Sequence, residues 1–174
     1  MVICGNAGVG KSTLGARVAK ELGAALVDID TCTERLVRLV MTTAGLHPDD
    51  RDSHDYKSLL REPVYETMFD IARENLRHVS CVIVGPFTRE RRRATWPTEL
   101  ATRLDARVEI VLARCSSEER RRRIEARKNP RDAGKLVSWD EYVRSGEDPG
   151  PLPFEHRVVD TTESMPHGAW ARTS

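Results

Sequence analysis

Short apolar runs alternate along this chain with longer stretches in which apolar residues recur every three or four positions. The runs predict buried strands, and the periodic stretches predict amphipathic helices. Because strands covered on both faces of a parallel sheet read as continuous apolar runs, the alternation predicts an α/β doubly wound fold with a parallel sheet. The expected strands cover residues 2–4, 25–29, 79–84, 108–113 and 157–160.

Capping residues set the bounds of the first two expected helices. Apolar residues recur at helical spacing over 14–22 and stop at Gly23, which suits a helix end. Thr31 and Glu34 match the capping-box spacing, in which a hydroxyl and a carboxyl three residues apart satisfy free N–H groups. A second helix is therefore expected from this box to about Gly45.

Further helical spacing follows in the middle and the last third of the chain. It covers residues 56–76, where we expect Pro63 to divide the helix in two, because proline interrupts helical hydrogen bonding. Ser116 and Glu119 form another capping box, which opens an arginine-rich helix ending near Pro130. The remaining expectations are a helix over 133–144 and no regular structure over 163–174.

Composition limits the class of protein. A length of 174 residues predicts a single domain over 1–174. No apolar run approaches the ~20 residues of a membrane span, and the start lacks a secretory signal, so we expect no membrane association and a cytoplasmic location. The net charge of +1 gives no global attraction for nucleic acid. The cysteines lack the spacing of a zinc site or disulfide framework and are expected to be reduced and mostly buried: Cys4, Cys32, Cys81 and Cys115.

The most specific motif is the glycine-rich segment between the first strand and the first helix. Residues 5–12 match G-x-x-x-x-G-K-[ST], and the strand and helix lie where this phosphate-binding loop needs them. Such a loop aims successive N–H groups at phosphate oxygens. Lys11 is expected to reach the β- and γ-phosphates, and the Ser12 hydroxyl to bind Mg²⁺. The predicted ATP-binding residues are Gly5, Asn6, Ala7, Gly8, Val9, Gly10, Lys11, Ser12 and Thr13.

Two carboxylates, Asp28 and Asp30, stand at the carboxyl end of the second expected strand. Ligands of open α/β sheets bind beyond the carboxyl ends of the strands, so both acids are expected near the phosphates. One can hold Mg²⁺, and the other can orient an acceptor hydroxyl and accept its proton. The alternative is that Asp30 only caps the following helix and Asp28 is a solvated strand residue.

With these residues, the chain resembles known P-loop proteins. The P-loop followed by the D-x-D-x-x-x-E pattern of residues 28–34 resembles the shikimate kinase and gluconate kinase group. Residues 82–90 resemble bacterial AAA-type P-loop ATPases related to chloramphenicol phosphotransferase and zeta toxins. Together the resemblances cover the chain from Met1 to about Thr162. They imply a five-stranded sheet ordered 2-3-1-4-5, an acceptor-binding helical region over about 31–78 and a mobile lid over about 118–145.

One departure from the pattern concerns the magnesium site. A standard Walker B strand ends in an acid, whereas the run 81–84 is followed by Gly85. The resemblance to the shikimate kinase group then implies that Asp28 supplies the carboxylate near Mg²⁺, together with Ser12.

The arginine-rich helix is the candidate source of lid cations. Arginines at i+3 and i+4 spacing share one face, and Arg127 and Arg131 flank a turn that suits a hinge. Lid arginines stabilise the charge that develops on a transferred phosphoryl group. A solvated helix face in an arginine-rich chain explains the pattern as well. The face consists of Arg120, Arg123, Arg127 and Arg131.

The acceptor site carries the weakest signal. His54 and Tyr56 lie where these kinases place the acceptor, and Arg89, beyond the third strand, is expected to face the same space. Arg89 suits an anionic acceptor. The neighbouring acids suit a polyhydroxylated or cationic one, and a solvated loop explains them equally: Asp49, Asp50, Asp52 and Asp55.

The residues together predict an ATP- and Mg²⁺-dependent kinase acting on a hydroxyl of a small molecule such as a sugar, nucleoside or antibiotic. Lys11, Asp30, Arg127 and Arg131 are the expected catalytic residues, and Asp30, Arg89, His54 and Tyr56 the expected acceptor contacts. Two alternatives stay open, a P-loop ATPase switch coupled to a partner and a kinase of polynucleotide ends. The sequence does not indicate an oligomeric state.

Overall fold

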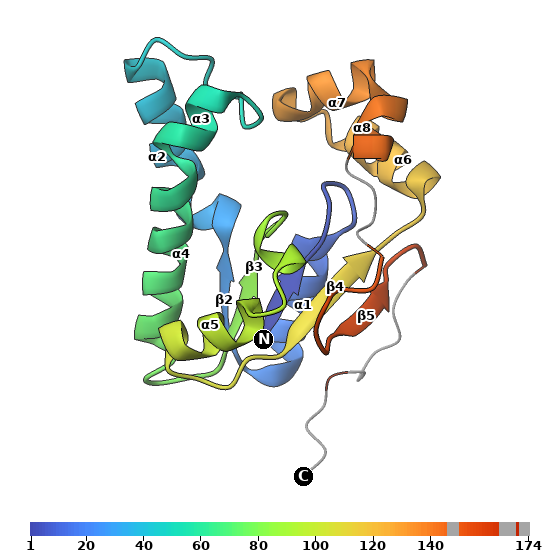
Figure 1. The fold of residues 1–174 in the computed structure, drawn as a ribbon. Helices are drawn as coiled ribbons and strands as arrows, with labels where there is room; N and C mark the ends of the chain where they lie inside the picture. The colour runs from blue at the N-terminus through green and yellow to red at the C-terminus, as the bar shows by residue number, and fades with distance from the viewer. Residues whose placement is uncertain (146–149, 164–169, 171–174) are drawn as a thin grey trace.

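A five-stranded parallel sheet forms the centre of the molecule (Figure 1). The computed structural model describes residues 1–145, 150–163 and 170. The strand order is β2-β3-β1-β4-β5, which confirms the expected 2-3-1-4-5 order of a P-loop fold. The strands are β1 (Val2–Cys4), β2 (Ala25–Asp28), β3 (Cys81–Val84), β4 (Ile110–Arg114) and β5 (Arg157–Asp160).

Helices cover both faces of the sheet, as a doubly wound fold requires. Side chains of successive strand residues point to opposite faces, so Ile3 joins the core beneath α1 while Val2 and Cys4 join the core beneath α2, α4 and α5. The helices are α1 (Lys11–Leu22), α2 (Ile29–Thr43), α3 (His54–Leu59), α4 (Arg61–Asn75), α5 (Trp96–Leu104), α6 (Ser117–Arg127), α7 (Ala133–Val137) and α8 (Trp139–Ser145), with short 3₁₀ turns η1 (Glu90–Arg92) and η2 (Pro130–Asp132).

The register of the sheet brings the carboxyl ends of β1, β2 and β3 to one edge, beside the last residues of β4. Asp28, the last residue of β2, pairs with Val84, the last residue of β3, and β1 and β4 pair Cys4 with Leu112. The segments that follow these strands therefore meet at the same carboxyl edge. Beyond it, α2, α3 and α4 rise on one side and α6, α7 and α8 on the other (Figure 1).

Helix α1 lies close against the sheet because Gly15 faces it. A Cβ atom at Gly15 would lie 2.4 Å from Cγ2 of Val84, so any side chain there would push the helix outward. Val84 itself is 1% exposed. Burying a valine of this kind contributes roughly 1.5–3 kcal/mol, which fixes the helix that carries Lys11 and Ser12.

The expected start of the second helix was wrong. Helix α2 begins at Ile29, and its N-cap is Asp28, whose carboxylate accepts a hydrogen bond of 2.9 Å from the backbone N–H of Asp30. Thr31 therefore lies inside the first turn and caps nothing. Half of the expected box at Ser116 forms. The Ser116 hydroxyl accepts from the N–H of Glu119 at 3.2 Å and so caps α6, whereas the N–H of Ser116 donates to the Thr162 hydroxyl rather than to Glu119.

Other helix bounds also differ from expectation. The break in the 56–76 stretch lies at Leu60, and Pro63 sits in the first turn of α4, where a missing N–H costs no helical hydrogen bond. The stretch 133–144 forms two short helices that part at Ser138. Helix α5 was not expected at all. Most of the 163–174 tail, residues 164–169 and 171–174, lies outside the described residues.

The lengths and apolar content of the helices also bear on membrane association. Within the described part of the chain, no helix has both the length and the apolar content to cross a membrane.

Candidate functional site

The P-loop joins β1 to α1 and is curled tightly against its neighbours. Gly5 has a φ of 146° and Gly8 a φ of 81°, conformations that L-residues with side chains rarely adopt. A Cβ atom at Gly5 would lie 2.6 Å from the carbonyl oxygen of Ala113, and one at Gly8 would lie 2.9 Å from Cγ1 of Ile124. Strand β4 and helix α6 therefore set the shape of the loop.

Lys11 lies at the mouth of the loop, half-buried, with Nζ donating a hydrogen bond of 2.7 Å to the carbonyl oxygen of Asn6. The pKa of Lys11 is lowered to about 8, chiefly by burial; Asp30 opposes this shift, and the positive charges of Arg91 and Arg127 add to it. An anion bound beside Nζ would favour the charged form. The Lys11 ammonium is therefore placed where it can form an ion pair with a phosphate.

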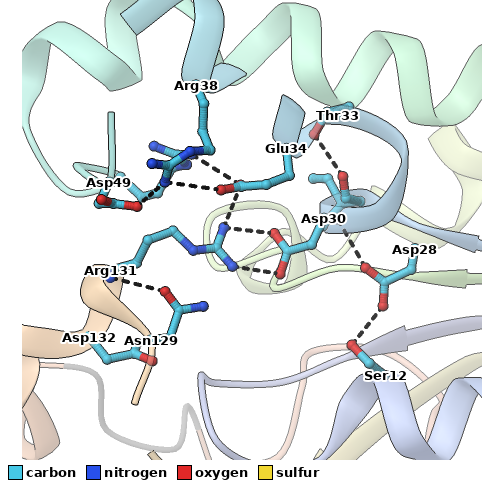
Figure 2. Close-up of polar contacts among 12 residues, drawn as sticks. Ser12, Asp28, Asp30, Thr33, Glu34, Arg38, Asp49, Asn129, Arg131 and Asp132 are labelled. Atoms are coloured by element: carbon cyan, nitrogen blue, oxygen red, sulfur yellow. Dashed lines mark hydrogen bonds and ion pairs between the residues drawn. The ribbon is translucent and has the colours of Figure 1, made fainter. Parts of the chain in front are cut away.

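Ser12 and Asp28 form the candidate magnesium site (Figure 2). The Ser12 hydroxyl donates to Oδ2 of Asp28 at 2.6 Å, and Asp28 is 6% exposed. Both groups offer the oxygen ligands that Mg²⁺ prefers, and Mg²⁺ in such sites takes few protein ligands besides phosphates and water. Among the described residues no three His, Cys, Asp or Glu side chains converge as a metal cage, which leaves this pair as the fitting donor set.

Asp30 follows Asp28 by two residues, in the first turn of α2, and binds Arg131 from the opposite side of the site (Figure 2). Both carboxylate oxygens accept from the guanidinium of Arg131, each at 3.1 Å, while the Asp30 side chain remains 59% exposed. Partial burial acts to raise the pKa of Asp30, but the hydrogen bonds and charge of Arg131, with Lys11 and Arg127, outweigh it and lower the pKa. Asp30 is therefore held as a carboxylate.

Glu34 joins the same network from the next turn of α2. Its Oε2 accepts from Arg131 at 2.9 Å and from Arg51 at 3.0 Å. Arg38 lies 3.9 Å from the other Glu34 oxygen and also pairs with Asp49 (Figure 2). The glutamate of the D-x-D-x-x-x-E pattern thus positions two arginines.

On the α6–α8 side, Asp132 organises the cations. It is 2% exposed, and its carboxylate accepts from Nε of Arg127 at 2.6 Å and from Lys135 at 3.1 Å. The Lys135 ammonium also lies 3.8 Å from Asp52, on the other side of the site. Ion pairs therefore link the two helical regions across the carboxyl edge of the sheet.

Apart from Arg38 and Asp49, these groups line one cavity of about 570 Å³. It runs from the P-loop past Asp28 and Asp30 to a wall formed by α2, α3 and α4, where Val64 and the rings of Tyr56 and Tyr65 face it. The cavity is therefore larger than a phosphate chain alone requires, and its far wall is partly apolar.

Tyr56, His54 and Arg89 are the predicted acceptor contacts, and the structure separates them. Tyr56 lines the cavity, with Arg51 5.2 Å from its ring. His54 is not among the described residues that line it, and its side chain is 93% exposed. Arg89 lines a second hollow, of about 400 Å³, between α4 and α5. The structure therefore does not bring Arg89 or His54 to the cavity that Tyr56 lines, and their expected contact with an acceptor finds no support in its geometry.

The predicted arginine face divides into different environments. Arg127 and Arg131 line the cavity, and so does Arg123, although Thr161 and Glu119 hold its guanidinium. Arg120 is buried, with Nε 3.3 Å from the carbonyl oxygen of Ala7. Its role is to brace the P-loop from α6 rather than to face a ligand.

The acids between α2 and α3 have local partners. Asp50 accepts from the backbone N–H groups of Asp52 and Ser53, both at 2.9 Å, and so shapes the turn. Asp49 pairs with Arg38. The solvated-loop alternative is therefore sufficient for these two acids.

Two residues that brace the P-loop were not expected. Arg91 is 3% exposed and donates to Oδ1 of Asn6 at 2.6 Å. Thr161, just after β5, is buried, and its hydroxyl donates a hydrogen bond of 2.6 Å to the carbonyl oxygen of Val9. Neither belongs to a motif in the sequence, because the two contacts join residues 85 and 152 positions apart.

The chain was compared with known proteins. A family model described as an AAA domain matches residues 1–147. No curated protein matches the sequence. A candidate kinase from Chloroflexus aurantiacus has a TM-score of 0.65 at 21% identity, over 92% of this chain and 86% of that chain. A sugar kinase from Janibacter sp. HTCC2649 has a TM-score of 0.57 at 17% identity, over 91% and 83%. A gluconokinase from Sinorhizobium meliloti has 0.54 at 18% identity, over 94% and 82%.

Proposed function

The chain belongs to the AAA domain family, and from that premise we propose that it is a kinase that transfers the γ-phosphate of ATP to a hydroxyl group of a small molecule. The observation that carries the proposal is the shared cavity. The P-loop and the carboxylate of Asp30 open onto the same space, which continues to the wall of α2, α3 and α4. A kinase needs this combination, because nucleotide and acceptor must meet at one point.

The nucleotide end of the reaction is assigned to the P-loop. Its backbone N–H groups and Lys11 would bind the phosphates, and Ser12 with Asp28 would hold Mg²⁺. The metal ion, when bound, supplies positive charge to the β- and γ-phosphate oxygens. The lowered pKa of Lys11, about 8, still leaves most of the ammonium charged at neutral pH.

The acceptor end is assigned to Asp30. Its carboxylate would accept a hydrogen bond from the attacking hydroxyl and take its proton as the bond to phosphorus forms. The lowered pKa of Asp30 makes it a weak base, so its main contribution would be orientation of the hydroxyl. Arg127 and Arg131 would stabilise the charge on the transferred group, which requires Arg131 to exchange Asp30 for the phosphate oxygens.

A different class of function, an ATPase switch coupled to a protein partner, remains the alternative. The extent of the cavity beyond the P-loop favours the kinase, because hydrolysis alone needs no acceptor space. The net charge of +1 weighs against a kinase of polynucleotide ends. A cytoplasmic location remains part of the proposal.

A screen for acceptor-stimulated ADP formation tests the proposal. The protein would be incubated with Mg-ATP and panels of sugars, sugar acids, nucleosides, hydroxylated antibiotics and polynucleotide ends. Sugars and sugar acids come first, because a gluconokinase and a sugar kinase share the fold. A true acceptor should raise ADP formation at least tenfold and should gain one phosphate by mass spectrometry. The Lys11→Ala variant is the blank. Steady ADP formation that no compound stimulates would favour the ATPase switch instead.

A further inference from the structure

The turn after β3 carries a buried arginine that the proposed reaction does not use. This turn, η1, presents Arg91 toward the interior, where the side chain is 3% exposed, while its neighbour Arg92 faces solvent. Burying a guanidinium is costly unless it is hydrogen-bonded or otherwise compensated. A buried arginine at this point therefore calls for a role.

Aromatic packing holds the turn in a fixed place. Phe87 is fully buried, and its ring centroid lies 5.1 Å from that of Trp96 and 5.4 Å from that of Tyr65. The backbone N–H of Phe87 also donates to the Tyr65 hydroxyl at 3.2 Å, and that of Arg91 donates to the carbonyl oxygen of Phe87 at 3.0 Å. The guanidinium is thus presented from a rigid support.

A second contact ties the turn to α4. Glu90 pairs with Arg61, with a nitrogen-to-oxygen distance of 2.9 Å. Arg61 in turn lies 4.8 Å from the ring of Tyr65. With Glu90 held outward in this way, Arg91 is left to point toward the P-loop.

The guanidinium of Arg91 acts on the P-loop at Asn6. It donates to Oδ1 of Asn6 at 2.6 Å, across 85 positions in sequence. The carbonyl oxygen of the same Asn6 accepts from Nζ of Lys11 at 2.7 Å. One residue therefore connects the buried arginine to the lysine that would bind phosphate. Cys4, beneath the loop, also contacts Arg91, and burial raises the pKa of its thiol to about 11, so the thiol is neutral.

We propose that Arg91 is a positioning residue of the nucleotide site, which fixes the side chain of Asn6 and thereby holds the P-loop in its phosphate-binding shape. The role rests on the proposed nucleotide site but does not depend on the identity of the acceptor. In this chain β3 is followed by Gly85 rather than by an acid. The segment after β3 thus contributes a cation beneath the P-loop, and its charge adds to the positive potential that attracts phosphates.

A double-mutant cycle on Mg-ADP affinity, measured by calorimetry, tests the proposal. Arg91→Met keeps the aliphatic stem and removes the donor, and Asn6→Ala removes the acceptor. Each is expected to weaken Mg-ADP binding about tenfold or more, since hydrogen bonds to charged groups are the strong ones. Because both substitutions remove the same contact, their effects should not add. The double variant should bind Mg-ADP no more than about twofold more weakly than the single variant with the lower affinity.

Two further variants separate positioning from simple stability. Arg92→Met alters the exposed neighbour in the same turn and should leave affinity within about twofold. Arg91→Lys keeps a donor and a charge and should recover part of the affinity lost in Arg91→Met. If Arg91→Met does not fold, Asn6→Ala and Arg91→Lys still report on the contact.

The outcomes are distinct. An Arg91→Met protein with a lower melting temperature but wild-type Mg-ADP affinity would overturn the inference, and so would fully additive losses in the cycle. A wild-type protein that binds no Mg-ADP would instead overturn the proposed nucleotide site, and the inference with it.

Discussion

Arg131 and Asp30, 101 residues apart in sequence, form a two-pronged ion pair with both nitrogen-to-oxygen distances at 3.1 Å. The pair joins the candidate lid to the candidate base. The same two oxygens of Asp30 would have to receive an acceptor hydroxyl. Under the proposed function, substrate binding would require the guanidinium to move, and the phosphate oxygens of ATP would be its new partner.

The first prediction concerns Lys11. Lys11→Ala should reduce phosphoryl transfer on the order of 10²-fold or more, because it removes a preorganised charge from the transferred phosphate. The fold should survive, since Lys11 is only half-buried and makes one hydrogen bond to a loop carbonyl. Steady-state ADP formation and thermal melting measure the two effects. Lys20→Ala, at the exposed end of the same helix, is the control; near-wild-type turnover of Lys11→Ala with its acceptor would refute the site.

The second prediction concerns Asp30. Asp30→Asn should lower kcat steeply, by about 10²-fold or more, and leave the KM for ATP nearly unchanged, because the carboxylate acts mainly in the transition state. The asparagine amide has one acceptor oxygen and cannot pair with both nitrogens of Arg131. Little stability should be lost, because the Asp30 side chain is 59% exposed and exposed ion pairs stabilise a fold only slightly. A change confined to the melting temperature would point to a purely structural role for the ion pair with Arg131 instead.

Asp28 should behave differently. Asp28→Asn should raise the Mg²⁺ concentration needed for half-maximal activity several-fold, because a neutral amide is a poorer ligand for a hard cation. Asparagine can still cap α2 by accepting from the N–H of Asp30, so the melting temperature should change little. A magnesium titration of activity measures the effect. Equal, small losses in the Asp28 and Asp30 variants, together with lower melting temperatures, would contradict the division of roles.

The pKa of Lys11 predicts how nucleotide binding depends on pH. Burial lowers this pKa to about 8 in the free protein, and bound phosphate favours the protonated amine. As pH rises above 8, binding must also take up a proton, so Mg-ADP affinity should fall, by up to tenfold per pH unit. Calorimetry between about pH 7 and 9.5 would show this loss, and Lys11→Met should bind weakly with a flat profile. A flat wild-type profile would contradict the shifted pKa.

The lid arginines give the last prediction. Arg127→Ala and Arg131→Ala should each slow transfer about tenfold or more. Arg131→Ala should cost little stability, whereas Arg127→Ala should also lower the melting temperature, because it leaves the buried carboxylate of Asp132 with Lys135 as its remaining cation. Arg122→Ala, whose side chain is 73% exposed and pairs with Glu119, is the matched control. Hydrogen exchange with and without an unhydrolysable ATP analogue should show slower exchange beyond Arg127 when nucleotide is bound. Strong protection there in both states would indicate a fixed segment rather than a lid.

The sequence predicted the parts of the site that are local. The P-loop, its flanking strand and helix and the two acids at the end of β2 lie within 30 residues, and their motif fixes their mutual placement. The strand order also follows, because a resemblance in the P-loop and the D-x-D-x-x-x-E pattern carries a topology with it. Spacing alone could not identify the N-cap of α2, because Asp28 and Thr31 are both residue types that are favoured at this position.

The parts that escaped prediction depend on contacts between distant segments. Arg91 belongs to the run Arg91–Arg93, a pattern typical of an exposed surface. Its burial depends on the packing of Phe87, whose carbonyl oxygen accepts from the backbone N–H of Arg91. Arg89, two positions earlier, faces a different hollow. Helix α5 is an exception, because Trp96, Leu100 and Leu104 recur at helical spacing and its prediction needed no distant contact. Glu34 appeared in the pattern, but its arginine partners come from two other regions of the chain.

Strand β5 and Thr161 bear on how far the chain can be shortened. The AAA domain match ends at residue 147, whereas the hydroxyl of Thr161 reaches back to Val9 in the P-loop. A chain cut at the family boundary would lose this support and would leave β4 as an uncovered outer strand. Unpaired N–H and C=O groups along such an edge recruit other chains. Strand β5 is itself an outer strand but is largely exposed, whereas β4 is apolar and buried beside it. Removal of β5 would expose this apolar edge and is expected to yield aggregates rather than a minimal folded domain.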